Sequence, residues 1–237
     1  MSKISWDDTG KKFYETGVKQ GVLFPQTGSN GTYEKGVAWN GLTNVSESPS
    51  GAEATALYAD DVKYLNLRSA EEFGGTIEAY TYPKEFEQCD GSAEIAPGVV
   101  AGQQKRSPFG FSYVTTLGND TEFDDYGYKL HIVYGATANP SEKGYATKSD
   151  SPEAITFSWE FTTTPVKVAG LSKPTSCITI NSKEVDAQKL AALEKILYGD
   201  TDVDPRLPLP NEIAEIFGAG ADAGAGAGTG TESEVSG

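Results

Sequence analysis

The chain has 237 residues, 38% of them hydrophobic, and its 19 lysines and arginines against 34 aspartates and glutamates give a formal net charge of −15. This length and apolar content allow a sizeable core, and all-β proteins of this size often form one domain. The negative charge argues against a clamp on nucleic acid, which neutralises phosphates with cationic side chains, and against binding to anionic membranes. The sequence shows neither the apolar run of a signal peptide nor a transmembrane stretch, so we expect a soluble protein made and kept in a cytoplasm-like setting.

Short runs that alternate apolar and polar residues, separated by Gly, Asn, Asp and Pro, predict β-strands along most of the chain. The predicted strands are 36–43, 61–69, 75–83, 109–117, 128–135, 151–166 and 175–181. Two of them each place four large side chains on one face: Phe109, Phe111, Tyr113 and Leu117, and Tyr128, Leu130, Ile132 and Tyr134. Several antiparallel strands with one buried face predict a two-sheet sandwich or a barrel.

Residues 44–60 form a long connection between two of these predicted strands. Long ordered loops inside a compact domain usually carry function. We therefore expect this loop to be a functional element.

The strand at 151–166 has the clearest two-residue period in the chain. Its predicted apolar side consists of Ile155, Phe157, Trp159 and Phe161, and its polar side of Thr156, Ser158, Glu160 and Thr162. Burying four such apolar side chains contributes at most about 6–12 kcal/mol, as much as the net stability of a typical domain. The strand is therefore predicted to be central, with a polar face that meets water or a polar surface.

Two segments switch to helical spacing. Residues 186–199 are predicted to form the main helix, capped by Asp186 and ended by Gly199, and to lie against the sheet. A shorter helix from Pro210 to Gly218 presents Ile213, Ile216 and Phe217 as anchors, and it needs a partner surface because two turns are marginal alone. Residues 218–237 contain too little to bury and are predicted to be a flexible tail.

No residue set in the sequence matches a catalytic, cofactor or metal site. The single histidine, His131, lacks a nucleophile elbow, and Cys89 and Cys177 are too far apart for ligand spacing and are predicted to be reduced, packed thiols. The carboxylates of 200–205 lack the glycine and glutamate of a calcium loop. Exposed aromatic residues such as Tyr80 and Tyr82 leave a monomeric carbohydrate-binding module as an alternative.

Four long runs, 13–25 ("FYETGVKQGVLFP"), 36–92, 127–166 and 205–217 ("PRLPLPNEIAEIF"), resemble the major tail tube protein of long, non-contractile-tailed bacteriophages. This resemblance implies a two-sheet sandwich or barrel of the phage tail tube type with a flanking helix. It implies hexameric rings that stack into a tube, the conduit for genome ejection. The implied domain is 1–217, with an N-terminal arm at 1–35 and a C-terminal arm at 200–217.

The resemblance also assigns roles to residues and partners. Ring stacking is expected in a loop formed by Ser48, Pro49, Ser50, Gly51, Ala52, Glu53 and Ala54. Lumen-facing positions are expected at Glu160, Glu78, Thr156, Ser158 and Thr162. The implied partners are copies of the chain itself, the tape measure protein, the tail terminator and the distal tail or baseplate proteins. Viral DNA would pass without specific binding, and the protein would assemble in the bacterial cytoplasm and reside in the virion.

Overall fold

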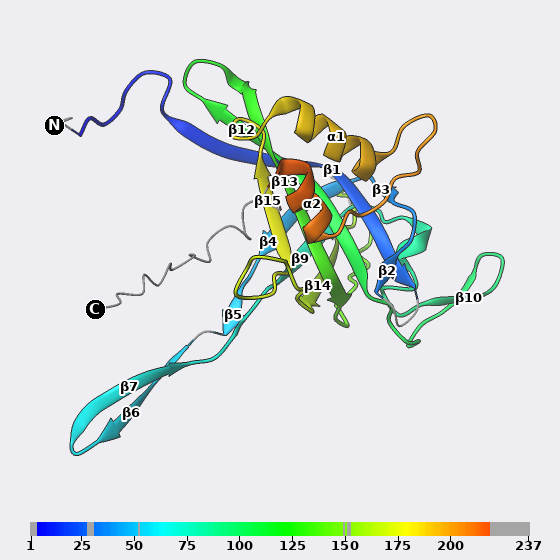
Figure 1. Ribbon diagram of the computed structural model, residues 1–237. Coiled ribbons are helices and arrows are strands. Elements are labelled where there is room, and N and C mark those ends of the chain that lie inside the picture. Colours follow the sequence, from blue (N-terminus) through cyan, green and yellow to red (C-terminus); the bar gives the residue numbers. More distant parts are fainter. Residues whose placement is uncertain (1–3, 28–30, 52, 149, 151–152, 219–237) are drawn as a thin grey trace, which may run out of the picture.

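The computed structural model describes residues 4–27, 31–51, 53–148, 150 and 153–218. Beyond Gly218, the predicted tail lies outside these residues. The chain is mainly β, with one large antiparallel sheet and two α-helices against it (Figure 1). The predicted fold class, a two-sheet β protein with a flanking helix, is confirmed.

The main sheet has nine strands in the order β2-β1-β12-β13-β14-β9-β4, with β3 added beside β1 and β15 beside β13. Their bounds are β1 Phe13–Thr27, β2 Thr32–Tyr33, β3 Val37–Trp39, β4 Leu42–Glu47, β9 Gly74–Ala79, β12 Phe109–Asn119, β13 Phe123–Ala138, β14 Phe157–Thr163 and β15 Cys177–Asn181. Three two-stranded sheets pair β5 Ser50–Gly51 with β8 Glu71–Glu72, β6 Ala54–Ala59 with β7 Val62–Arg68, and β10 Ala93–Ala96 with β11 Val99–Ala101.

The sheet folds over on itself at β13, which belongs to both layers. Residues 129–133 of β13 pair with β15, and residues 136–138 pair with β14. Gly135 lies between these two stretches with φ +59°, and a Cβ there would come within 2.4 Å of the Thr164 carbonyl oxygen. Because only glycine tolerates both the left-handed conformation and this close approach, Gly135 permits the change of partner.

Aromatic side chains fill the inner core between the two layers. The Trp39 ring lies 5.6 Å from Trp159 and 5.5 Å from Phe111. Phe86, from the 3-10 helix η1 Lys84–Phe86, stacks edge-on against Trp159 at 5.1 Å. Trp159 and Phe161 are buried, as their alternation with polar residues predicts. This core unites β1, β3, β9, β12 and β14.

The helices cover the outer face of the layer formed by β1, β12, β13 and β15 (Figure 1). α1 Ala187–Tyr198 begins at Asp186, whose carboxylate accepts from the Gln188 and Lys189 amides, as predicted. α2 Pro210–Phe217 ends at Gly218 in the left-handed conformation. Leu190, Leu193 and Leu197 pack onto Leu130 and Ile132, so the helices close a second core.

Three expectations need correction. The N-terminal arm cannot span 1–35, because Phe13–Thr27 is a central strand that pairs with β12. Residues 44–60 are no loop, because they hold the end of β4 and the strands β5 and β6. The predicted strand 151–166 begins only at Phe157, so Ile155 precedes it and is 38% exposed rather than buried.

Candidate assembly surfaces

The layer formed by β4, β9 and β14 has a continuous polar face opposite its aromatic one. In the pairing register Ser158 lies opposite Glu78, which lies opposite Asn44. In the next row Glu160 lies opposite Thr76, which lies opposite Ser46. We call this the polar face; its residues are Asn44, Ser46, Thr76, Glu78, Ser158, Glu160 and Thr162. Four of the five predicted lumen residues therefore share one surface.

Exposure differs along the polar face. Glu160 and Thr162 are exposed, whereas Glu78 and Ser158 are half-buried. Thr156, the fifth predicted lumen residue, is exposed but precedes β14, so no strand pairing places it on this face. None of the residues of β4, β9 or β14 is lysine or arginine, which leaves the face acidic.

A shallow groove of about 250 Å³ connects the polar face to the short β5–β8 sheet. Glu160 and Thr162 line it from β14, and Ser48 and Ser50 line it from the predicted stacking loop. The structure thus brings together two residue sets that were predicted separately. Ala52, also predicted for stacking, lies outside the described residues, and Ala54 is the first residue of β6.

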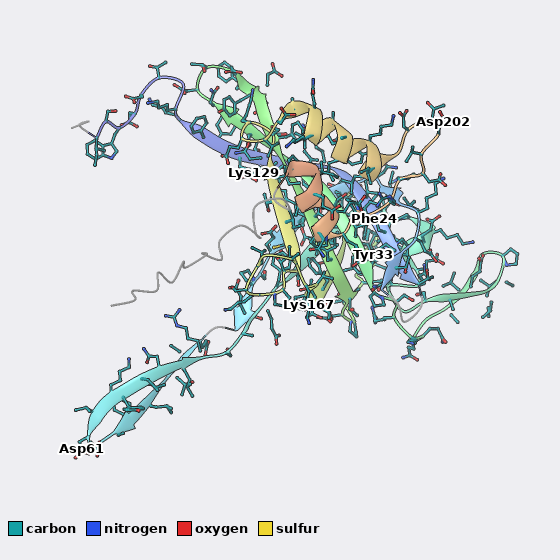
Figure 2. The ribbon with its side chains drawn as sticks, viewed as in Figure 1. Phe24, Tyr33, Asp61, Lys129, Lys167 and Asp202 are labelled. Atoms are coloured by element: carbon teal, nitrogen blue, oxygen red, sulfur yellow. The ribbon has the colours of Figure 1, made fainter. Side chains whose placement is uncertain are left out.

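The β6–β7 hairpin extends far from both layers, with Asp61 at its tip (Figures 1 and 2). Leu57 pairs with Leu65 and Thr55 with Leu67, so these four side chains share one face. The opposite face carries Tyr58, Lys63, Asn66 and Arg68. Val62 and Leu67 are 62% and 55% exposed. The hairpin is therefore an amphipathic ribbon with an uncovered apolar side, which we call the apolar hairpin face.

The predicted anchors lie on α2. Ile213 is buried in the outer core, and Ile216 and Phe217 are half-buried against it. Lys189 on α1 donates to the Phe217 carbonyl at 3.2 Å, and Arg206 forms a two-pronged ion pair with Glu212. Arg206 lowers the pKa of Glu212 below its usual range. The Lys189 contact and the burial of Ile213 hold α2 against α1 and the outer core, and the Arg206–Glu212 pair joins α2 to the segment before it.

At the base of the hairpin, a polar cluster lies between the layers. We call it the root cluster; it consists of Glu15, Glu47, Tyr113, Thr115, Lys129, His131 and Thr179. Glu47 is the last residue of β4 and accepts from the Tyr113 hydroxyl at 2.6 Å. The His131 ring stacks on Tyr113 with centroids 4.6 Å apart and an interplanar angle of 2°.

These contacts shift the pKa values of three groups in the root cluster. The His131 ring, and then the Tyr113 hydroxyl, lower the pKa of Glu47. Burial raises the pKa of Glu15, but hydrogen bonds from Lys129 at 2.6 Å and Thr115 at 2.5 Å outweigh it and leave that pKa lowered. Burial and the bond to Glu47 raise the pKa of Tyr113. Both carboxylates therefore stay ionised at neutral pH.

Sequence reasoning missed two further exposed apolar surfaces. The segment before β1 exposes Ile4 and Trp6, the start of β1 exposes Phe13, and the start of β13 exposes Phe123. The β10–β11 hairpin exposes Ile95, Val99 and Val100 on another side of the molecule (Figure 1). Neither segment alternates apolar and polar residues as the predicted strands of the two layers do.

Metal-ligating side chains do not cluster in the described part of the chain. No group of three or more His, Cys, Asp or Glu residues is placed to hold a metal there. The calcium-like segment uses Asp200 and Asp204 in ion pairs with Lys195 and Lys35. Among the described helices, none is long and apolar enough to cross a bilayer.

Comparison with known proteins finds no family model and no curated protein that matches this chain.

Proposed function

We propose that this chain is a structural subunit that assembles into stacked hexameric rings, as the major tail tube protein of a long, non-contractile-tailed bacteriophage. In this role it would reside in the virion and surround the path of genome ejection. Its neighbours would be its own copies, the tape measure protein, the tail terminator and the distal tail or baseplate proteins. The single observation that carries the proposal is the apolar hairpin face.

A two-stranded ribbon alone is marginally stable in water, and its free apolar side costs further stability. Burying each of the large side chains of the apolar hairpin face would contribute about 1.5–3 kcal/mol. Leu57, Leu65 and Leu67 are the main contributors to such burial. A second subunit that covered this face would stabilise both partners, which is the requirement for stacking rings.

The polar face fits the wall of a DNA conduit. Its hydroxyls and carboxylates place no cation beside a phosphate, so this face would not bind passing DNA through phosphate neutralisation. Among the described strands, β4 is hydrogen-bonded to β9 on one side and to no strand on its other edge. A neighbouring subunit could continue the sheet at that edge and close a ring.

The alternative, a carbohydrate-binding monomer, depends on exposed aromatic rings. Tyr80 is 54% exposed, but Tyr82 packs edge-on against Trp159 at 5.4 Å and against Phe157 at 5.6 Å. Of this pair, only Tyr80 keeps a ring free for stacking on a sugar. We favour the tube because a monomer would leave the apolar hairpin face uncovered.

Electron microscopy of concentrated, negatively stained protein tests the proposal. We expect hollow tubes of uniform diameter with a regular axial repeat, and immunogold labelling along phage tails by an antibody against the chain. A matched variant in which a short Gly-Ser turn replaces residues 54–68 should stay monomeric. Monomeric wild-type protein at every concentration, together with binding on a glycan array, would refute the tube and support the alternative.

A further inference from the structure

The root cluster fixes which nitrogen of His131 carries a proton. The Thr115 hydroxyl donates its hydrogen to Glu15 at 2.5 Å, so toward His131 it can only accept. Nε2 lies 2.9 Å from that hydroxyl oxygen and must therefore be the protonated nitrogen of the neutral ring. Any further proton must go to Nδ1.

Nδ1 faces the root of the hairpin. It lies 3.6 Å from a carboxylate oxygen of Glu47 and 3.4 Å from the Thr179 hydroxyl, which can donate to it while it is unprotonated. Glu47 ends β4, and the next residue, Ser48, donates its amide to the Gly74 carbonyl at 2.8 Å, where the stem of the hairpin begins. A charge on Nδ1 thus acts directly on the strand that leads into the hairpin.

The groups around the ring carry charges of both signs. Glu15 comes from β1, Glu47 from β4 and Lys129 from β13 itself, while Tyr113 on β12 and Cys177 on β15 are neutral because their pKa values are raised. With a neutral ring, two carboxylates face one ammonium group, and the cluster carries one net negative charge. With a protonated ring it carries none.

We propose that protonation of His131 at Nδ1 pairs it with Glu47 and fixes the root of the β6–β7 hairpin, and that loss of this proton loosens the root. Histidine ordinarily titrates between about pH 5 and 8. Glu47 stays ionised across that window because its pKa is lowered. The pair is therefore present on the acidic side of the window and lost on the alkaline side. This device stands whether or not the subunits form a tube.

Hydrogen exchange measured by mass spectrometry tests the device on the full chain. Protection factors, corrected for the intrinsic pH dependence of exchange, are compared at pH 5.5 and 8 for peptides that cover the root amides, Ser48 and Gly74 included. We expect about fivefold or greater protection at the lower pH. Nuclear magnetic resonance of the His131 ring should show its protonation at the same pH at which root protection changes. Its signals are unambiguous because His131 is the only histidine.

Two variants and a control make the test specific. Glu47→Gln keeps an acceptor for Tyr113 but removes the charge, and should abolish the pH dependence of root protection. Thr179→Val removes the hydroxyl that donates to unprotonated Nδ1 and so favours the neutral ring. The pH at which root protection is half lost should therefore move higher. Glu53→Gln, an exposed glutamate beyond the root, should behave as wild type. Equal wild-type protection at both pH values, or a pH dependence that survives in Glu47→Gln, overturns the proposal.

Discussion

Leu57 on β6 lies directly opposite Leu65 on β7, and both side chains stand on a ribbon that leaves the two-layered body. They are 40% and 38% exposed, although they cover each other. The contact buries only part of the apolar surface of the two leucines, and their outer side still meets water. The arrangement makes sense if a second subunit covers it.

Leu65→Asp should therefore abolish tube formation and leave the fold intact. Its neighbour Asn66 pairs with Ala56 on the opposite face of the same ribbon, so Asn66→Asp introduces the same charge as a matched control. We expect both variants to unfold at the wild-type temperature, since neither position belongs to either core. Sedimentation and electron microscopy give the answer, and tubes formed by Leu65→Asp would show that this face is not an interface.

The anchors on α2 predict a graded loss of stability. Ile213 is 5% exposed in the outer core, so Ile213→Ala should lower the free energy of unfolding by about 2–4 kcal/mol. Ile216→Ala should cost less because its side chain is half-buried. Truncation after Gly218 should cost nothing measurable, since the removed residues have little apolar surface to bury. Urea titrations rank the three, and a large loss on truncation would contradict the assignment of 218–237 as a tail.

Cys89 provides a chemical test of the inner core. It is completely buried, and burial, helped by Glu34 and Asp90, raises the pKa of its thiol to about 12. At pH 8 only ~1 in 10,000 of such thiols is the reactive thiolate. In a Cys177→Ser variant, Ellman's reagent should thus react with Cys89 at least ~100-fold more slowly in the folded protein than in denaturant. Rapid reaction of the native variant would mean that the segment after η1 opens readily.

Local patterns in the sequence predict the helices and the paired strands because each has a single buried face. Asp186 and Gly199 mark the ends of α1, and Phe109, Phe111 and Tyr113 mark the inner face of β12. β1 escapes prediction because residues 21–25 are buried on both faces, which removes the alternation. The pattern at 61–69 predicts β7, but β6 falls in the predicted loop 44–60, and the position of the β6–β7 hairpin outside the two layers is not predicted.

The hairpin has the alternation of a body strand, but no layer of the subunit covers it. Whether an apolar face meets the protein's own core or a partner is decided by tertiary geometry, which local periodicity does not contain. The same limit applies to His131, whose partners come from four other strands: Glu15, Glu47, Thr115 and Thr179. The polar face could be predicted strand by strand, but the register that joins Glu160 to Thr76 and Ser46 could not.

That register gives the final prediction, which concerns charge in the conduit. Glu160 is exposed in the middle of a face without basic residues. If this face lines the lumen, Glu160→Lys places a ring of cations around the DNA, repeated at every level of the tube. Each cation that neutralises a phosphate adds to binding, so the tube should retain the genome instead of passing it.

We expect virions with Glu160→Lys to assemble normally and to eject DNA at least ~10-fold more slowly at low salt, where the Debye length is about 30 Å at 0.01 M. The defect should shrink at physiological salt, since screening shortens that length to about 8 Å. Glu85→Lys, an exposed glutamate of η1 away from the polar face, makes the same charge change and should eject normally. Wild-type kinetics for Glu160→Lys at low salt would remove the polar face from the lumen. Failure of this variant alone to assemble would place Glu160 in a subunit interface, so that another surface of the subunit must face the DNA.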